Sequence, residues 1–454
     1  MIHKFEIEGT KIVLDVNSGT VHVMDAAAWD VVDDFRVLSE EEIIAKHARK
    51  YHPEEVREVL AEISRLVTEG TLLAEDSYTG GVPVYDAPPV VKSICLNVSH
   101  DCNLRCSYCF AGSGHFGGNR TLMTFETGCQ AIDFLLAQSA GRRHCELDFF
   151  GGEPLMNIET VRKLVSYGKT RAAGKKKEIK FTLTTNALLL NDEITDFLNS
   201  ENISVVLSLD GRPAVNDAMR AMAGTGRGSY ALIRPKITSF VNSRNNENYF
   251  VRGTFTRYNL DFSRDALHLA DLGYRYISVE PVVGSPAEDW SIKEGDLPEI
   301  FNEYETLTGE YLRRMKEDRP FEFFHFNLDL NNGPCIPKRL SGCGAGHEYM
   351  AVTPEGDLYP CHQFVGREQF LLGNVLNGVT NMELVNKFRQ AHIYNKEKCR
   401  SCWARFHCGG GCHANAELAN ATIMEPYHIG CELEKKRLEC AIYTQVLKAG
   451  YNEI

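Results

Sequence analysis

Three cysteines, Cys102, Cys106 and Cys109, follow an apolar segment at 93–98 with the spacing C-x3-C-x2-C. Three thiolates on one short loop can each hold one iron of a [4Fe-4S] cluster, which leaves the fourth iron open to another molecule. A structural zinc site would need a fourth ligand, and the sequence offers none nearby. The spacing therefore predicts a cluster with an open iron.

This loop, with Tyr108 before its last cysteine and a predicted strand in front of it, resembles that of the radical S-adenosylmethionine (SAM) enzymes. The resemblance implies that Cys102, Cys106 and Cys109 are the catalytic cluster ligands. It also implies that the open iron chelates the amino and carboxylate groups of SAM, and that one-electron reduction releases a 5′-deoxyadenosyl radical.

A second motif, Gly151-Gly152-Glu153-Pro154, ends the next predicted strand. Glycines allow close backbone approach to a ligand, and a carboxylate accepts hydrogen bonds from an ammonium group. By itself the motif is an ordinary turn. The resemblance implies that it binds SAM, with Phe110 beside it.

Polar residues also end the later predicted strands. Asn186, Ser208 and Asp210 resemble the family's contacts to the ribose and methionine parts of SAM, although Asn186 and Asp210 also suit helix capping. Arg220 and Arg227 are alternative partners for the SAM carboxylate. Glu280 ends another strand and faces either SAM or substrate.

The C-terminal part contains nine of the fifteen cysteines. Their spacing resembles the SPASM domain, which holds two auxiliary [4Fe-4S] clusters in radical SAM peptide modifiers. The resemblance implies a first auxiliary cluster on Cys343, Cys361 and Cys412, and a second on Cys399, Cys402, Cys408 and Cys431. Either Cys335 completes the first cluster or its last iron is open to a substrate thiolate. A zinc ribbon at 399–412 is the alternative.

The elements that position these residues divide the chain into three. Residues 1–78 contain strand patterns at 5–8, 12–15 and 21–24, then helical patterns at 26–35, after Ser39 and from Pro53. This order predicts a winged-helix-like unit. Residues 79–330 alternate strands and helices, with strands expected at 93–98, 146–150, 180–184, 204–209, 250–256 and 276–281. We expect an α/β fold with a partial (β/α)6 barrel, followed by a cluster-binding domain at 331–454.

Composition narrows the class of protein. With 43% hydrophobic and 24% charged residues, no apolar run of ~18 residues and no signal-peptide pattern, a cytoplasmic protein without a membrane partner is expected. An odd number of cysteines in that compartment favours clusters over disulfides. Residues 1–76 hold 17 acidic and 8 basic side chains, which argues against nucleic acid as a partner.

The N-terminal unit resembles the element with which maturases of ribosomal peptides bind a leader peptide. The leader would add to the edge of the strand at 21–24, beside the helix at 53–68. The remaining alternatives are a DNA-binding winged helix and a purely structural cap. Residues 14–19, 342–346 and 359–364 suggest the greatest likeness to the SCIFF maturases, which make thioether bridges in a small cysteine-rich peptide.

The sequence therefore predicts an enzyme that forms thioether cross-links between a cysteine sulfur and a peptide carbon, using three [4Fe-4S] clusters and SAM. Its partners would be a cysteine-rich precursor peptide, bound through its leader, and a flavodoxin or ferredoxin as reductant. Formylglycine formation in a sulfatase and carbon-carbon cross-linking are alternatives. A zinc-stapled peptide-binding adaptor is an alternative of another class. Cys95, Cys129, Cys145 and Cys440 are expected to be buried and to have no such role.

Overall fold

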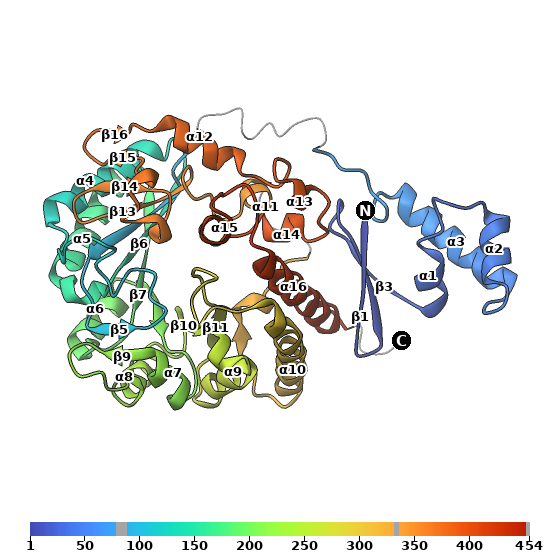
Figure 1. Cartoon of the computed structure of the whole chain (residues 1–454), viewed down its shortest axis with the longest axis horizontal. Coiled ribbons are helices and arrows are strands. Elements are labelled where there is room, and N and C mark those ends of the chain that lie inside the picture. Colours follow the sequence, from blue (N-terminus) through green and yellow to red (C-terminus); the bar gives the residue numbers. More distant parts are fainter. Residues whose placement is uncertain (79–88, 331–335, 451–454) are drawn as a thin grey trace.

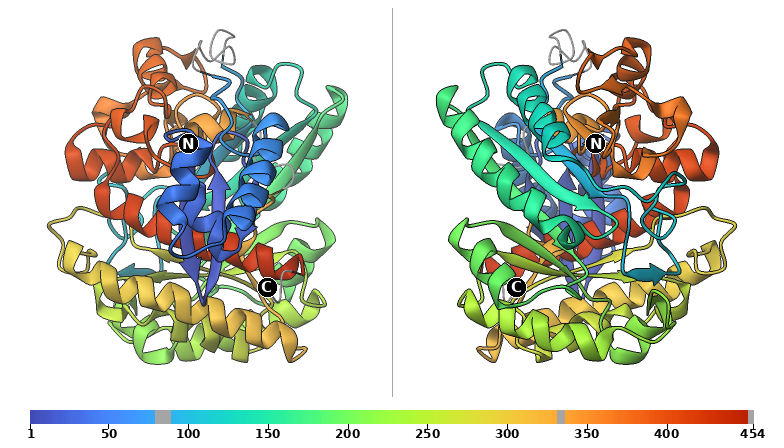
Figure 2. Two further views of the ribbon diagram at one scale, coloured as in Figure 1. Left: turned by 90° about the vertical axis from the view of Figure 1, so that its right-hand side faces the viewer. Right: turned by 90° about the vertical axis from the view of Figure 1, so that its left-hand side faces the viewer.

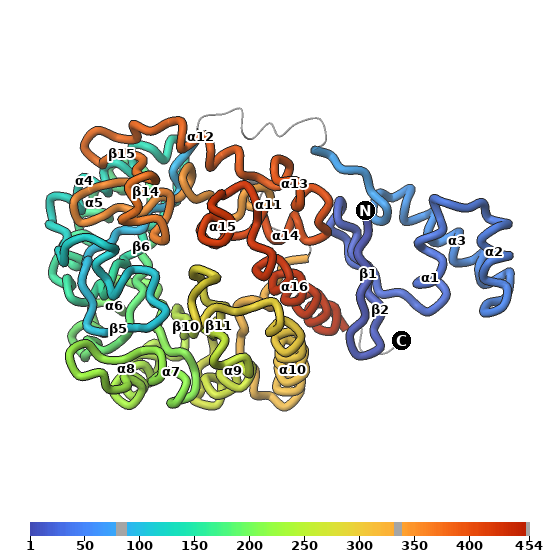
Figure 3. The backbone as a smooth tube through the Cα atoms, viewed as in Figure 1, coloured from blue at the N-terminus to red at the C-terminus, as the bar shows by residue number. Residues whose placement is uncertain are grey.

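The computed structural model describes residues 1–78, 89–330 and 336–450 of the 454-residue chain (Figure 1). A large sheet with helices on its outer side forms the body of the molecule, and a smaller unit of strands and helices lies beside helix α16 (His428–Lys448). The smooth trace of Figure 3 follows the chain from that small unit into the body and back to α16.

The small unit has the predicted order of three strands and three helices. Its elements are β1 (Ile2–Ile7), β2 (Thr10–Asp15), β3 (Val21–Met24), α1 (Ala26–Val31), α2 (Glu40–His47) and α3 (Pro53–Thr68). Ser39 and Glu42 form the predicted capping box at the start of α2. Helix α1 ends earlier than the expected 26–35, because Asp34 accepts hydrogen bonds from Lys46 and His47 of α2 and the chain turns toward them.

The three-stranded sheet of this unit is covered on both faces. Val13 of β2 packs with α1 and α3, whereas its neighbours Ile12 and Leu14 point the other way and join the core of the body. Figure 2 shows this sheet lying against α16. Strand order is β1-β2-β3, so β3 is an edge strand.

The six predicted strands of the body are all present and form one parallel sheet, in the order in which they occur in the chain. They are β4 (Ser93–Ser99), β6 (His144–Gly151), β7 (Glu178–Thr185), β8 (Ser204–Ser208), β10 (Tyr249–Phe255) and β11 (Tyr276–Pro281). The helices that follow them are α4 (Phe125–Gln138), α5 (Ile158–Gly174), α6 (Asp192–Ser200), α7 (Pro213–Met219), α8 (Tyr230–Ser243), α9 (Phe262–Asp271) and α10 (Leu297–Lys316). This is the predicted α/β architecture with a partial barrel.

The C-terminal part extends the same sheet, which the sequence did not predict. Strand β13 (Tyr349–Val352) pairs in parallel with β4, and β14 (Asp357–Tyr359), β15 (Gly373–Asn374) and β16 (Gly378–Val379) continue outward from it. At the other edge, β12 (Glu322–Phe323) pairs with β11. The remaining elements are α11 (Ile336–Ser341), α12 (Met382–Gln390), α13 (Glu397–Arg400), α14 (Arg405–Cys408) and α15 (His413–Asn420).

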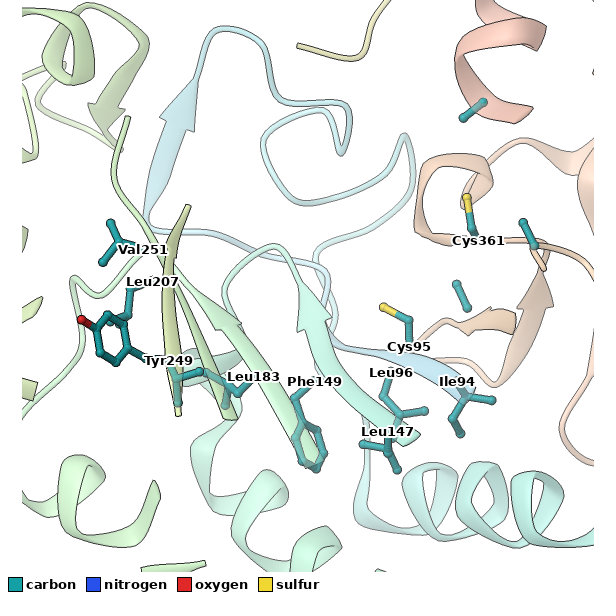
Figure 4. Packing of buried hydrophobic residues seen from close by; sticks show 14 of the residues in the cluster. Ile94, Cys95, Leu96, Leu147, Phe149, Leu183, Leu207, Tyr249, Val251 and Cys361 are labelled. Atoms are coloured by element: carbon teal, nitrogen blue, oxygen red, sulfur yellow. The ribbon is translucent and has the colours of Figure 1, made fainter. Parts of the chain in front are cut away.

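Alternation along the strands separates the core from the interior of the barrel. Leu147 and Phe149 are buried toward the helices, and Cys95 points away from them (Figure 4). Asp148 pairs with Cys95 in the register and shares its face of the sheet. In the part of the chain that the structure describes, no helix has the length and apolar character needed to cross a membrane.

Candidate functional site

The three cysteines of the C-x3-C-x2-C loop lie together at the carboxyl end of β4 and line one cavity of about 190 Å³. A short antiparallel ladder between β5 (Leu104–Cys106) and β9 (Arg220–Met222) pairs Cys106 with Arg220 and holds the loop in place. Burial raises the pKa of Cys102 and Cys106 to about 12. These thiols therefore keep their protons at neutral pH unless they bind a metal, which releases the protons.

The two glycines of the second motif accommodate the cysteine loop itself. A Cβ atom at Gly151 would lie 2.2 Å from the Ser99 carbonyl oxygen, and one at Gly152 would lie 2.2 Å from that of Asp101. The Gly152 amide donates to Ser99 O (2.7 Å), and the Glu153 amide donates to Asp101 O (2.9 Å). From the sequence, the two glycines were expected to let the backbone approach a ligand. In the structure they let it approach the loop that contains Cys102.

Glu153 is 1% exposed, and its carboxylate is already hydrogen-bonded. It accepts from the Thr185 hydroxyl (2.7 Å) and from the amides of Leu155 (3.0 Å) and Asn186 (2.8 Å). Burial raises the pKa of Glu153 to about 7. The carboxylate thus joins two neighbouring strand ends while it remains part of the cavity wall.

The cavity gathers the predicted SAM contacts with one exception. Phe110, Gly151, Gly152, Glu153, Asn186 and Ser208 all line it. Asp210 is fully buried behind the wall, where it accepts a hydrogen bond from the Tyr108 hydroxyl (2.6 Å) and pairs with Arg220 (3.0 Å). The structure thereby separates the two alternative arginines, because Arg220 lines the cavity and Arg227 is exposed.

Glu280 of β11, which the sequence predicted to face SAM or substrate, also lines the cavity. Two further lining residues were not singled out by the sequence: Arg252 of β10, which forms an ion pair with Glu280, and Gln363 of the C-terminal part. An arginine inside a predicted strand was the available signal for Arg252, since a charge there must face the barrel interior or solvent.

An aromatic group connects this cavity to the C-terminal cysteines. The ring of His362, next to Cys361, lies 5.3 Å from the ring of Phe110 and 5.0 Å from that of Phe150, centroid to centroid. Phe110 in turn follows Cys109. The predicted ligand loops of two different clusters therefore meet across three stacked or tilted rings.

The C-terminal cysteines fall into two spatial groups. Burial raises the pKa of the Cys361 thiol, and the nearby Cys343 and Cys412 raise it further. Burial also raises the pKa of Cys408 and of Cys431, with smaller contributions from Cys431 and Cys399 at Cys408 and from Cys399 and Cys402 at Cys431. Cys335 lies outside the described residues. Of the four cysteines without a predicted role, Cys95, Cys145 and Cys440 are buried and Cys129 is half-buried.

One feature fits clusters at these positions. Lys396 is 1% exposed, and its ammonium donates to Gly410 O (2.8 Å), in the loop between Cys408 and Cys412. Buried ammonium groups need a negative partner, which thiolate-bound clusters provide.

Comparison with known proteins agrees with this geometry. Residues 92–231 match the family of the 4Fe-4S single cluster domain, and residues 343–403 match the SPASM family, described as an iron-sulfur cluster-binding domain. The radical SAM cyclopropyl synthase TigE of Paramaledivibacter caminithermalis is 25% identical over 368 residues, which are 76% of this chain and 72% of TigE. Other relatives are named mycofactocin maturases and anaerobic sulfatase-maturating enzymes.

Two solved structures share the fold. One is anSMEcpe with bound AdoMet and the Cp18Cys peptide, at a TM-score of 0.65 and 20% identity over 81% of this chain and 100% of that one. The other is Streptococcus suis SuiB bound to its precursor peptide SuiA, at a TM-score of 0.53 and 15% identity over 95% of this chain and 98% of SuiB. The two matched domains, the relatives that span most of the chain and the common fold agree, and the chain is a radical SAM enzyme with a SPASM domain, which uses [4Fe-4S] clusters and SAM.

Proposed function

We propose that this enzyme forms thioether cross-links in a ribosomally made, cysteine-rich peptide. The observation that carries the proposal is the path from the SAM cavity to the first group of C-terminal cysteines. Gln363 lines that cavity two residues after Cys361, and His362 contacts the ring of Phe110. A peptide in the cavity would therefore lie beside both the loop of Cys102, Cys106 and Cys109 and the segment that contains Cys361.

The chain's own residues would divide the work between them. Cys102, Cys106 and Cys109 would hold the cluster that binds SAM, and Gly151, Gly152, Glu153, Asn186 and Ser208 would shape the SAM site. When bound, these cofactors supply a one-electron reductive cleavage of SAM and a carbon radical that removes one hydrogen atom from the peptide. Phe110, Phe150 and His362 would hold the peptide carbon near that radical, since reaction requires close and fixed placement.

The remaining part of the reaction would take place at the C-terminal cysteines. Cys343 and Cys412 are exposed beside the buried Cys361, so a substrate thiol can reach this group. With three protein ligands, this site would offer an open position to a thiolate. The new bond would join sulfur to carbon. The hydrogen atom would go to the deoxyadenosyl radical and the thiol proton to solvent, and the cluster held by Cys343, Cys361 and Cys412 would accept the remaining electron when bound. The ligands Cys399, Cys402, Cys408 and Cys431 would hold the second auxiliary cluster.

The peptide would be bound through its leader at the N-terminal unit, as predicted from the sequence. Two hollows, of about 700 and about 870 Å³, open beside the edge strand β3. Helix α16 lines both hollows, α10 also lines the larger one, and residues 328–330 also line the smaller one. Helix α3, which the sequence had placed beside the leader, lines neither. An extended peptide would thus add to β3 while it faces the body of the enzyme.

The test is incubation of the anaerobically reconstituted enzyme, SAM and a chemical reductant with cysteine-rich peptides encoded by neighbouring genes. A thioether removes two hydrogens from the peptide and consumes one thiol for each bridge. A carbon-carbon link would give the same mass change and leave the thiol reactive, and formylglycine would react with aldehyde reagents. Either of these outcomes would overturn the thioether assignment. An enzyme that binds zinc and cleaves no SAM would overturn the radical assignment as well.

A further inference from the structure

The turn at residues 15–20 is built more rigidly than a hairpin needs. The Asp15 carboxylate is fully buried and accepts hydrogen bonds from the amide of Asn17 (3.2 Å) and from the amide and hydroxyl of Ser18 (2.8 and 2.9 Å). Its second oxygen accepts from the Ala74 amide (3.1 Å). The turn is therefore tied to the segment that follows α3.

This rigid turn presents Asn17 to the C-terminal part. The Asn17 amide group donates to Ala74 O (2.8 Å), which fixes its orientation. Its oxygen accepts from the guanidinium of Arg405 (2.6 Å), and Asp76 accepts from the same nitrogen (2.9 Å). Arg405 is 5% exposed, and its other terminal nitrogen donates to Arg400 O (2.5 Å).

Arg405 occupies a central position among the predicted ligands of the second auxiliary cluster. It lies between Cys402 and Cys408 and begins α14, whose last residue is Cys408. The amide of Cys402 donates to Cys399 O (3.0 Å), so the segment 399–408 is one folded unit. Trp403 in the same segment stacks on His3 of β1, with centroids 3.7 Å apart and ring planes at 2°.

We propose that the N-terminal unit has a second function, which is to position the cysteine segment 399–408 through Asn17, Asp76 and Arg405. The proposal rests on the cluster ligands of the proposed function, but not on peptide recognition. A buried guanidinium needs its acceptors, because an unpaired buried charge is strongly destabilising. Arg405 is thus a positioning residue for the second auxiliary cluster. Its partner Asp76 belongs to the N-terminal unit and is 329 residues away in the sequence.

The same turn also lines one of the two hollows where the leader peptide is proposed to bind. Residues 18–20 line the smaller hollow beside β3, while Asn17 contacts Arg405. Deletion of the N-terminal unit would therefore remove peptide recognition and cluster support together. Point variants are needed to separate the two functions.

The first experiment measures iron and acid-labile sulfide in full-length Arg405→Gln enzyme reconstituted without oxygen. We expect a loss of about four of about twelve irons per chain, which is one cubane of three. Arg400→Gln is the matched control, because that exposed guanidinium lies in the same segment and contacts only Tyr394 O in the described structure. Arg405→Lys keeps the charge and should retain more iron than Arg405→Gln. Full iron content in Arg405→Gln would overturn the proposal.

A second measurement covers the case in which Arg405→Gln does not fold. Cys431→Ala removes a predicted ligand that lies on α16, outside the segment 399–408 that contains Arg405. Loss of the cluster should then increase amide hydrogen exchange in residues 399–408 and also in residues 15–20. Cys109→Ala, which affects the SAM cluster, should leave residues 15–20 unchanged. Unchanged exchange of residues 15–20 in Cys431→Ala would contradict the proposal, whereas about four irons in the unmodified enzyme would contradict the auxiliary-cluster assignments themselves.

Discussion

The imidazole ring of His362 lies 5.3 Å from the phenyl ring of Phe110, centroid to centroid, and joins the segment of Cys361 to the loop of Cys109. If these rings hold the peptide, His362→Ala should retain SAM cleavage and lower the yield of cross-linked peptide per SAM cleaved about tenfold, because poorly placed substrate reacts slowly. His362→Phe keeps a ring and should retain most of the yield. The ratio of 5′-deoxyadenosine to cross-linked peptide measures this. Equal ratios in all three enzymes would exclude a positioning role.

Gly152→Ala should disrupt the SAM-binding cluster. The added Cβ would lie 2.2 Å from the Asp101 carbonyl oxygen, and backbone cannot move aside as a flexible side chain does. We expect loss of about four irons per chain and of SAM cleavage. Gly118→Ala is the control, since its nearest neighbour would be 3.6 Å away. Normal cleavage by Gly152→Ala would show that the loop adapts.

Cys343→Ala, Cys361→Ala and Cys412→Ala should each reduce cross-linking more than SAM cleavage. The physical reason is that these three cysteines form a separate group and do not line the cavity proposed to bind SAM, although Gln363, two residues after Cys361, does. Parallel assays of 5′-deoxyadenosine and of peptide mass provide the measurement. Normal cross-linking by all three variants would remove this group from the reaction.

Lys396→Met should make at least one auxiliary cluster harder to reduce. Loss of a buried positive charge disfavours the more negative reduced state, and we expect the midpoint potential to fall by about 60 mV or more, which is about tenfold for one electron. Lys398→Met is the matched control, because Lys398 is exposed and pairs with Glu425. Potentiometric titration followed by EPR would detect the shift. Identical potentials for both variants would contradict the inference that the Lys396 ammonium balances the negative charge of an auxiliary cluster.

Asp148→Asn should stabilise the protein, and increasingly so as the pH rises. Burial raises the pKa of Asp148 to about 7, and its Oδ1 has no hydrogen-bond partner among the described residues. Because the folded pKa exceeds the unfolded one, the carboxyl destabilises the fold progressively from about pH 4 to pH 7, by at most ~1.4 kcal/mol per pH unit. The gain in thermal midpoint should therefore be larger at pH 7.5 than at pH 5.5. A gain of equal size at the two pH values would contradict the raised pKa of Asp148.

Local sequence patterns were sufficient for the order of the elements and for the ligand motifs. The spacing of Cys102, Cys106 and Cys109 depends on one loop, and the six parallel strands follow from alternating apolar segments, which are local properties of the chain. Even so, the sequence left open whether Arg220 or Arg227 faces SAM. Only the structure shows that Arg220 lines the cavity beside Asp210 while Arg227 is exposed, because the position of Arg220 depends on how β9 pairs with β5.

Only the tertiary structure brought distant segments together. No periodicity indicates that β13 continues the barrel sheet at β4, that the backbone of Asp101 fills the space beside Gly152, or that Asn17 meets Arg405. Such contacts depend on the path of the whole chain and on complementary packing between surfaces, whereas periodicity and spacing report only neighbours along the chain. The sequence alone therefore predicted the chemistry of the cysteines, and the fold decided which segments hold them in place.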